Sequence, residues 1–314
     1  LKPIKHVLYN QPVWPEKLYS LLFWCSQFYQ YPLGDTLFNA MPSALRKGKD
    51  ADFATLVEWQ LTASGRDQLM AGFGRAVKQA KVMHMLESGS IPHQRFVDEE
   101  ISSSVLKTLA EKGWIESIEK RPVIREWKHD VEADVDKPKL NSEQAVAIAT
   151  VNSNEGFACY LLEGVTGSGK TEVYLNLIKP VLEQGRQALV LVPEIGLTPQ
   201  TINRFRKRFN VPVEVVHSGL NDTERLNAWL SARDNAAGIV IGTRSALLTP
   251  FANLGIIIVD EEHDASYKQQ DSLRYHARDV AVMRANKEQN PIVLGSATTA
   301  LETLQPTPKT HVPR

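Results

Sequence analysis

The glycine-rich run at residues 164–171 has the residue types that bind the phosphates of a nucleotide. It matches the pattern GxxxxGK(S/T) at every fixed position, after an apolar segment and before an expected helix at residues 172–184. In this context backbone N–H groups and the helix N-terminus attract phosphate, the lysine reaches the β- and γ-phosphates, and the threonine binds Mg²⁺. The predicted phosphate-binding residues are Gly164, Val165, Thr166, Gly167, Ser168, Gly169, Lys170 and Thr171.

Two adjacent acids stand where a second apolar segment, residues 254–259, ends. An aspartate there can hold Mg²⁺, usually through water, and a glutamate can orient or deprotonate the water that attacks a phosphate. The alternative is an acidic surface turn, although adjacent carboxylates at a buried strand end are costly without a cation. We therefore predict ATP and Mg²⁺ as ligands. The predicted catalytic residues are Lys170, Asp260 and Glu261, and the predicted Mg²⁺ ligands are Thr171 and Asp260.

The elements that must position these residues can be traced in the second half of the chain. Beyond residue 140, short apolar runs alternate with helical stretches. Such runs are typical of strands that are buried on both faces and separated by helices. The predicted fold class of this part is therefore α/β with a parallel sheet. The expected strands lie in residues 158–162, 188–192, 213–216, 238–241, 256–259 and 292–294.

The first half of the chain has a different pattern. Residues 16–31 place apolar side chains at helical spacing and predict an amphipathic helix with a buried face. Residues 48–125 contain helical stretches near residues 69–77 and 98–109. Short strands are expected after them, and helices followed by a small hairpin favour a winged-helix module. These strands lie at residues 114–115 and 123–124.

Residues 126–139 separate the two halves. They are polar and rich in charge, and a proline, Pro138, stands next to their end. This is the composition of a linker. We therefore expect a domain boundary there. The chain begins at Leu1 without a methionine, and we expect it to be a fragment.

Composition excludes several classes of protein. The 314 residues are 43% hydrophobic and 23% charged, which is ordinary for a globular chain of two or three domains. The 36 basic and 36 acidic residues cancel, so only local patches could draw the protein to nucleic acid. Two cysteines without a CxxC pair argue against a zinc site and favour a cytoplasmic location. The apolar runs are far shorter than the roughly 20 residues of a membrane helix, so no membrane contact is expected.

Residues around the nucleotide site resemble the motifs of superfamily 2 DExH helicases in their expected order. Residues 260–263 read Asp-Glu-Glu-His, and residues 191–200, 241–246 and 295–298 resemble motifs Ia, Ib and III. Gln144 lies where these helicases have an adenine-reading glutamine; the alternative is part of a helix cap, and both can hold together. The resemblance implies DNA-phosphate contacts by Thr198, Thr243 and Arg244, and coupling between the nucleotide and DNA sites by His263, Ser296 and Thr298.

A closer resemblance is to the PriA family of replication-restart helicases, also called primosomal protein N′. The resemblance covers essentially residues 1–304, and six short segments carry it. They are residues 31–35, 164–174, 192–200, 217–222, 260–269 and 274–279. The resemblance implies an ATP-driven 3′-to-5′ DNA helicase of primosome assembly and replication restart. Its implied partners are forked and single-stranded DNA, other primosome proteins and single-stranded-DNA-binding protein.

The resemblance also implies a division of the chain. Residues 1–47 would be the end of a domain that binds a 3′ strand end, 48–125 the winged helix, and 140–304 a RecA-like lobe that binds ATP. A loop after the acids would sense single-stranded DNA by stacking on bases and neutralising phosphate. The alternative for its residues is packing or plain surface. They are Tyr267, Lys268, Tyr275 and His276.

Three departures from the family bear on activity. A second RecA-like lobe with its arginine has no counterpart, so hydrolysis is expected to be slow and unwinding absent. The family's cysteine-rich zinc insertion is missing, so zinc is expected for the full-length family but not here. Thr299 replaces a proline, and residues 305–314 resemble nothing in the family, which favours a truncated or frame-shifted product. The alternative is a fork- or partner-binding remnant that binds ATP without unwinding; a kinase or transporter ATPase is disfavoured by the motif set.

Overall fold

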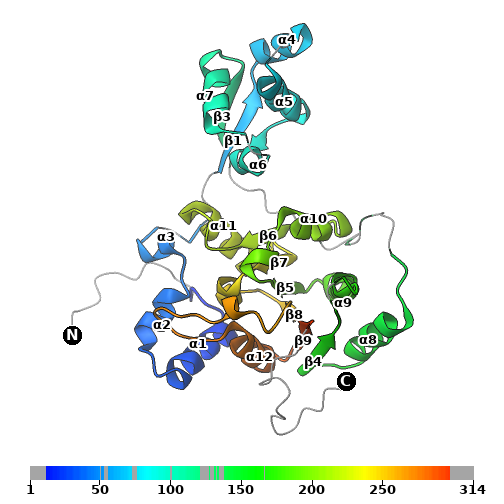
Figure 1. Cartoon of the computed structure of the whole chain (residues 1–314). Coiled ribbons are helices and arrows are strands. Elements are labelled where there is room, and N and C mark those ends of the chain that lie inside the picture. Colours follow the sequence, from blue (N-terminus) through cyan, green and yellow to red (C-terminus); the bar gives the residue numbers. More distant parts are fainter. Residues whose placement is uncertain are drawn as a thin grey trace, which may run out of the picture. The chain divides into compact units, whose positions relative to one another are not determined.

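The computed structural model describes residues 12–49, 51–52, 56–72, 76–99, 101–120, 127, 131, 133, 138–165 and 167–297. The chain forms two compact units (Figure 1). The large unit combines Leu1–Asp52 with Ile124–Arg314, and the small unit is Phe53–Val123. Within the described residues, no helix is long and apolar enough to span a membrane.

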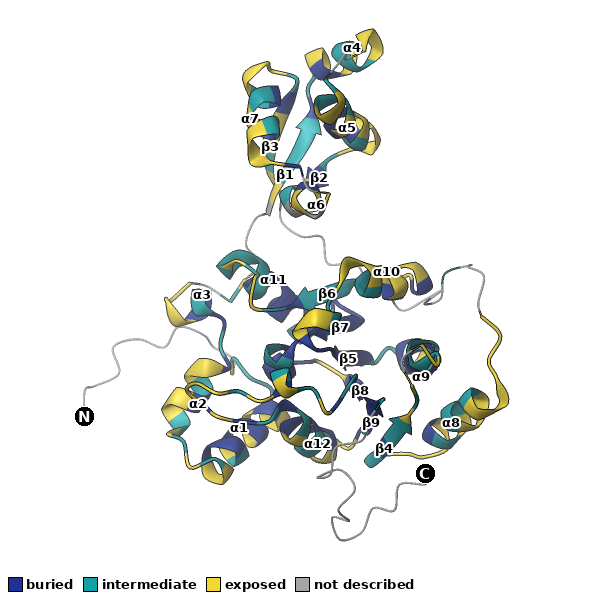
Figure 2. Ribbon diagram, in the orientation of Figure 1, coloured by how far each residue is buried: buried dark blue, intermediate teal, exposed yellow. Residues whose placement is uncertain are grey.

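A six-stranded parallel sheet forms the centre of the large unit, with the strand order β4-β9-β8-β5-β7-β6. Every apolar run expected to be a strand overlaps one of these six, so the α/β prediction is confirmed. Strands β5, β7 and β8 are buried along their whole length because helices cover both faces of the sheet (Figure 2). The strands are β4 Ala158–Glu163, β5 Gln187–Leu191, β6 Val213–Val216, β7 Ile239–Gly242, β8 Leu254–Val259 and β9 Pro291–Ser296.

Two hydrophobic clusters lie on opposite faces of this sheet because side chains alternate along each strand. On β5, Ala188 and Val190 belong to one cluster, and Leu189 and Leu191 to the other. The first cluster is completed by helices α8 Ser142–Asn152, α9 Lys170–Glu183 and α10 Pro199–Arg208. The second is completed by α1 Glu16–Phe28, α11 Asp222–Arg233 and α12 Ala277–Glu288.

The N-terminal helices are part of the large unit. The predicted amphipathic helix is confirmed as α1, which ends at Phe28, and its apolar face is buried on the α12 side of the sheet. Two short helices follow, α2 Leu33–Asn39 and α3 Ser43–Arg46. Lys47 forms an ion pair of 2.7 Å with Asp222 at the start of α11. Residues 16–40 therefore share a core with the parallel sheet.

The small unit has an antiparallel three-stranded sheet with the order β2-β1-β3 and a hydrophobic cluster of its own. Among its described residues, four helices lie between or beside the strands. The winged helix stays a prediction. The elements are β1 Leu56–Leu61, α4 Ala63–Ala71, α5 Val77–Met85, the 3-10 turn η1 Leu86–Ser88, β2 Ile91–Pro92, α6 His93–Asp98, α7 Ser103–Glu111 and β3 Ile115–Lys120.

Several local expectations for the small unit need correction. Residues 69–77 do not form one helix, because Gly72 adopts a φ of +84° and ends α4. Residues 98–109 belong to two helices, with α6 ending at Asp98 and α7 beginning at Ser103. The strand expected at residues 114–115 begins at Ile115 and is longer than expected; the strand at residues 123–124 lies outside the described residues.

The expected linker contains residues that pack on the large unit. Trp127 and Val131 are both 5% exposed and join the cluster on the α9 side of the sheet. The Trp127 Nε1 donates to the Asn235 carbonyl at 2.9 Å, and the Val131 carbonyl accepts from the Asn210 N–H. The linker prediction is therefore wrong at these two positions. Their apolar side chains stand alone in a polar stretch but pack in the hydrophobic cluster of the large unit, against residues distant in sequence.

Candidate nucleotide-binding site

Three neighbouring strands bring the site together at one edge of the large sheet. β4 leads into the glycine-rich loop, β8 ends before Asp260, and β9 ends at Ser296; in the sheet β9 lies between the other two. The Gly164 N–H donates to the Ser296 carbonyl at 3.0 Å, which fixes the start of the loop to the end of β9. Carboxyl ends of parallel strands are where ligands bind in open α/β sheets.

The glycine-rich loop has the close packing that its glycines allow. Gly167 and Gly169 have φ angles of +83° and +88°, a region that glycine enters without steric cost. A Cβ on Gly164 would lie 2.6 Å from the Ser168 Oγ, and one on Gly169 would lie 2.5 Å from the Gln144 Nε2. Helix α9 begins directly at Lys170, so its free N–H groups and dipole point at the loop. Thr166 lies outside the described residues.

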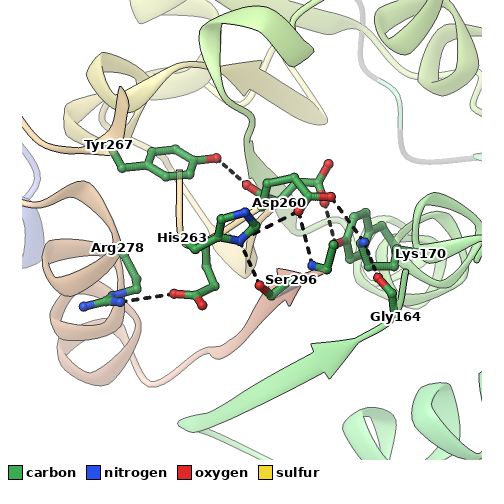
Figure 3. Close-up of polar contacts among 11 residues, drawn as sticks. Gly164, Lys170, Asp260, His263, Tyr267, Arg278 and Ser296 are labelled. Atoms are coloured by element: carbon green, nitrogen blue, oxygen red, sulfur yellow. Dashed lines mark hydrogen bonds and ion pairs between the residues drawn. The ribbon is translucent and has the colours of Figure 1, made fainter. Parts of the chain in front are cut away.

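Lys170 connects the loop to the acids. Its ammonium donates to the Gly164 carbonyl at 2.6 Å and lies 3.2 Å from the Glu261 Oε1 (Figure 3). The lysine side chain is only 9% exposed, so the pair is largely shielded from water and the attraction is stronger than at a surface. Two of the three predicted catalytic residues, Lys170 and Glu261, are thus in contact, and Asp260 lines the same cavity.

The carboxyl of Asp260 sits in a partly buried position that favours a nearby cation. Burial raises its pKa above the usual value, a hydrogen bond from Tyr174 opposes this, and the negative charge of Glu261 adds to the rise. Thr171 lines the same cavity as both acids. Two carboxylates and a hydroxyl that line one cavity form an oxygen-rich donor set of the kind that Mg²⁺ prefers. The residues present therefore fit Mg²⁺.

Glu261 and His263 reach from the acidic turn to the end of β9. Glu261 has a φ of +45°, which is uncommon for a non-glycine residue. Its Oε2 accepts from the Ala297 N–H at 3.3 Å and lies 3.9 Å from the His263 Nδ1. The same histidine nitrogen is 2.9 Å from the Ser296 Oγ. Two of the three predicted coupling residues therefore touch; Thr298 lies outside the described residues.

Tyr174 and Gly295 belong to the site and were not anticipated from the sequence. The Tyr174 hydroxyl donates to the Asp260 Oδ1 at 2.8 Å, and burial raises the tyrosine pKa well above its ordinary value, so the hydroxyl stays protonated. A Cβ on Gly295 would lie 1.7 Å from that hydroxyl oxygen. The sequence contained a signal for each residue. Tyr174 is four residues after Lys170 and so lies on the same helical face. A glycine inside a strand, such as Gly295, often marks a position that another group approaches closely.

Gln144 is both a cap and a neighbour of the loop. Asn141 and Gln144 form a capping box at the start of α8, as the capping alternative predicts. The Gln144 Nε2 also donates to the Ser168 carbonyl at 3.1 Å. One donor hydrogen of this amide therefore remains for a ligand among the described contacts, and contact with a base stays a prediction.

A cavity of about 870 Å³ lies along the outer side of the loop and α9. It is bounded by six of the predicted phosphate-binding residues, 165 and 167–171, and by both acids. The basic end of α10 contributes Arg204, Lys207 and Arg208. Arg208 is paired with Glu172 at 2.8 Å. A volume of this size is typical of small-molecule sites, and the cavity offers a nucleotide room beside its phosphate loop.

The residues predicted to contact DNA occupy different environments. Thr198 is exposed and caps α10 by accepting from the Thr201 N–H, whereas Thr243 is 5% exposed. The Arg244 Nη1 donates to the Ser266 and Lys268 carbonyls at 2.9 and 3.2 Å. Lys268 is exposed and His276 half-buried. Phosphate contact by these side chains stays a prediction.

Tyr267 and Tyr275 do not offer a stacking surface. Tyr267 is 1% exposed and its hydroxyl donates to the Asp260 carbonyl at 2.7 Å. Tyr275 is 7% exposed and belongs to the core on the α12 side. The base-stacking interpretation does not fit either position in this structure, because both rings are covered by the large unit. The packing alternative fits both.

A buried ion pair links the acidic turn to α12. Glu262 is completely buried, and its Oε2 lies 3.1 Å from the Arg278 Nη1 in the first turn of the helix (Figure 3). The Glu262 N–H donates to the Gly295 carbonyl at 2.9 Å. The third acid of the turn is therefore structural: it attaches the turn to a helix and to β9, and leaves phosphate chemistry to its two predecessors.

Two family models match the chain. The model described as DEAD/DEAH box helicase matches residues 141–307, and the one described as 3′DNA-binding domain (3′BD) matches residues 1–42. The first covers more than half of the chain and contains every residue of the nucleotide site described above.

Curated relatives are similar over most of the chain. The replication restart protein PriA of Haemophilus influenzae is 44% identical over 97% of this chain and 42% of its own length. The protein of the same name from Bacillus subtilis is 45% identical over 73% of this chain and 29% of its own length. Among solved structures, the Hef helicase domain of Pyrococcus furiosus is 24% identical over 52% of this chain and 34% of that one, with a TM-score of 0.39. The chain spans less than half the length of these relatives.

The geometry and the family match agree on the same residues. The glycine-rich loop, Lys170 and the acids after β8 all lie within the matched region 141–307. This chain therefore belongs to the DEAD/DEAH box helicase family, and over 97% of its length it is similar to the replication restart protein PriA of Haemophilus influenzae.

Proposed function

We propose that this chain binds ATP with Mg²⁺ in the cavity beside α9 and is the nucleotide-binding part of a 3′-to-5′ DNA helicase of primosome assembly and replication restart. The observation that carries the proposal is the position of Lys170. Its ammonium lies between the loop carbonyl of Gly164 and the carboxylate of Glu261, at 2.6 and 3.2 Å. A bound phosphate would meet the lysine, the loop and both acids together.

Phosphate binding would change the partners of Lys170. Phosphate oxygens compete with Glu261 for the ammonium, and the loop N–H groups and α9 dipole add to their attraction. Glu261 is then released to accept a hydrogen bond from a water and orient it toward the terminal phosphate. Its other carboxylate oxygen stays near the Ala297 N–H and His263, so the side chain keeps its direction when the lysine leaves.

Asp260 and Thr171 are the residues that would hold Mg²⁺. The ion supplies positive charge that neutralises the negative charge developing on the phosphate oxygens. Tyr174 holds one oxygen of Asp260 and leaves the other for the ion or its water. The remaining part of the cavity, toward Gln144, would take the base and ribose.

Nucleic acid would bind to parts of the chain outside this cavity. The match of residues 1–42 to a 3′DNA-binding domain supports DNA as the partner. We extend this to forked and single-stranded DNA, with Thr198, Arg244, Lys268 and His276 as phosphate contacts and the small unit as a winged helix. We further propose that the chain acts in the cytoplasm and that its protein partners are other primosome proteins and single-stranded-DNA-binding protein. The similarity to PriA supports this part of the proposal.

Nucleotide binding and steady-state ATPase activity of the purified chain test the proposal. Wild type is compared with Lys170→Ala, and with Lys179→Ala as a control on the same helix, whose ammonium is 3.8 Å from Glu183. Lys170→Ala is expected to weaken Mg²⁺-dependent ATP binding about 10- to 100-fold, since it removes a charged hydrogen bond to phosphate. The control should bind as wild type does.

The ATPase assay, run with and without forked DNA, separates two forms of the proposal. DNA-stimulated turnover that Lys170→Ala abolishes would mean that this lobe hydrolyses ATP. Binding without turnover would mean that catalysis requires an arginine supplied from elsewhere, which is worth about 10³- to 10⁵-fold in related phosphoryl-transfer enzymes. Equal binding by wild type and Lys170→Ala would contradict the proposed site.

A further inference from the structure

The stretch of chain that follows the small unit is hydrogen-bonded to the end of α10. The Ala133 N–H donates to the Arg208 carbonyl at 2.9 Å, and the Asn210 N–H donates to the Val131 carbonyl at 2.9 Å. Val131 is also buried in the cluster on the α9 side of the sheet. Two backbone bonds and a buried side chain therefore hold this stretch, residues 131 and 133, against the large unit.

A few residues later the same stretch reaches the nucleotide cavity. Pro138 and Lys139 line the cavity of about 870 Å³ together with the loop and both acids. Four residues separate Ala133 from Pro138, and five residue steps of extended chain span at most about 18 Å. The bond at Ala133 therefore limits how far this part of the cavity wall can move away. Residues 131, 133, 138 and 139 are called the connecting segment below.

Arg208 joins the connecting segment to the helix that follows the phosphate loop. Its carbonyl accepts from Ala133, and its side chain lies 2.8 Å from the Glu172 Oε1. Glu172 is in the first turn of α9, directly after Thr171, and its Oε1 also accepts from the Asn176 Nδ2 at 3.0 Å. The two side chains of the ion pair are 6% and 14% exposed, so their attraction is stronger than at a surface. Helices α9 and α10 and the connecting segment thus meet at Arg208.

The same ion pair also affects the charge of the cavity. Arg208 and Glu172 both line it, and Glu172 is two residues after Lys170. An uncompensated carboxylate there would repel the phosphates that the loop and the helix N-terminus attract. Arg208 compensates this carboxylate through its side chain and holds the connecting segment through its backbone. Its effect on phosphate and its effect on the cavity wall can therefore be measured separately.

We propose that Arg208 is a positioning residue of the nucleotide site, and that ATP binding is coupled through it to the attachment of the connecting segment on α10. The proposal rests on the proposed ATP-binding function and adds to it. Base and ribose would fill the part of the cavity that Gln144, Pro138 and Lys139 line. ATP therefore binds better when the segment is attached, and bound ATP strengthens the attachment by the same factor, because such coupling is reciprocal.

Inorganic triphosphate separates the two ends of the site, since it has the phosphates of ATP without base or ribose. Ala133→Pro removes the N–H that donates to Arg208 and changes no charge. It is expected to weaken binding of Mg²⁺ and ATP about tenfold, the effect of a wall that is in place in about a tenth of the molecules. Triphosphate binding should be unchanged, which also shows that the loop is folded. Calorimetric titration of the full chain gives both affinities, with Ala133→Ser, which keeps the N–H, as the reference.

Arg208→Gln tests the side chain of the same residue. It leaves the Glu172 carboxylate uncompensated, so both ATP and triphosphate should bind more weakly than to wild type. Adding Glu172→Gln removes that charge, and the double variant should recover triphosphate binding while ATP binding stays about tenfold weaker. Affinities for the two ligands that fall and recover in parallel would overturn the positioning role, because charge alone would then explain them.

Hydrogen exchange of the Ala133 amide measures the coupling from the other side. Saturating Mg²⁺ and ATP should slow its exchange about tenfold by the same linkage, whereas Mg²⁺ and triphosphate should leave it unchanged. The Trp114 amide of the small unit, which donates to the Leu109 carbonyl at 3.1 Å, is the internal control.

The outcome for Lys170→Ala distinguishes failure of this inference from failure of the site. If Lys170→Ala weakens ATP binding but ATP does not slow exchange at Ala133 in wild type, the coupling is overturned and the nucleotide site remains. If Lys170→Ala binds ATP and triphosphate as wild type does, both the site and the coupling are overturned.

Discussion

Each of the two adjacent carboxylates at the nucleotide site is held by one side chain of α9. Lys170 lies 3.2 Å from the Glu261 Oε1, and Tyr174 donates to the Asp260 Oδ1 at 2.8 Å. The two α9 residues are one helical turn apart, so a single helix orders both acids. The lysine can move to a phosphate, whereas the buried tyrosine stays, which makes Asp260 the fixed member of the pair.

Tyr174→Phe is expected to raise the Mg²⁺ concentration needed for half-maximal ATP binding about tenfold, the usual effect of losing a residue that orients a metal ligand. The measurement is a Mg²⁺ titration of the binding of a fluorescent ATP analogue. Tyr160→Phe is the control, because Tyr160 is a buried tyrosine of β4 whose hydroxyl contacts Asn154. The same Mg²⁺ midpoint in Tyr174→Phe and wild type would show that the tyrosine is only a packing residue.

The two cysteines are expected to be unreactive in the folded protein. Burial raises the pKa of Cys25 to about 12 and that of Cys159 to about 11, because a thiolate is poorly solvated there. At pH 8 both should react with a disulfide reagent far more slowly than in denaturant, and the native rate should rise only as the pH nears 11. Rapid reaction of either thiol at pH 8 without denaturant would contradict this.

At the scale of elements, β9 and α9 approach each other closely at Gly295 and Tyr174. Gly295 in β9 leaves the space that the Tyr174 hydroxyl occupies, and its carbonyl accepts from the Glu262 N–H. At Gly295 the strand therefore contacts both α9 and the acidic turn. Any side chain there must displace the tyrosine, β9 or both.

Gly295→Ala is expected to destabilise the large unit by about 1 to 3 kcal/mol, the usual cost of overpacking a core. The added Cβ would lie 1.7 Å from the Tyr174 oxygen but 3.0 Å from its ring carbon Cζ. The double variant with Tyr174→Phe should therefore recover part of the loss. Urea unfolding of the two single variants and the double variant gives the coupling; strictly additive losses would mean that the two residues do not compete for this space.

The whole molecule consists of two units with separate cores. The cluster around Leu61, Phe96 and Leu106 belongs to the small unit, and the two clusters on the faces of the parallel sheet belong to the large unit. The nucleotide site is formed within the large unit. Nucleotide binding should therefore stabilise the large unit directly.

Calorimetry of the full chain is expected to show two unfolding transitions. Mg²⁺ and ATP at a hundred times the dissociation constant should stabilise one of them by about 2.7 kcal/mol and leave the other unchanged. Lys170→Ala should keep both transitions and lose the shift. A single transition that moves as a whole with ATP would indicate that the units unfold together.

Much of the nucleotide site was predictable because its signals are local. The glycine-rich loop and Lys170 are consecutive residues whose neighbours in sequence are also their neighbours in space. The six parallel strands were found because burial on both faces produces short apolar runs, and the Asn141–Gln144 capping box is complete within four residues. Boundaries in the small unit were less well predicted, because helical spacing can continue across a glycine that ends a helix.

The sequence by itself determined the fold class, the phosphate loop and the acids, since strand burial and phosphate binding leave contiguous patterns. Only the tertiary structure decided that Trp127 and Val131 are core, that Tyr267 and Tyr275 are covered, and that Tyr174 holds Asp260 across a space kept open by Gly295. It also decided that residues 39–42 and α11 line one cavity. These outcomes depend on contacts between residues far apart in the chain, such as Trp127 with Asn235, 108 positions apart, and Tyr174 with Asp260, 86 positions apart. No local pattern encodes which distant surface a side chain will meet.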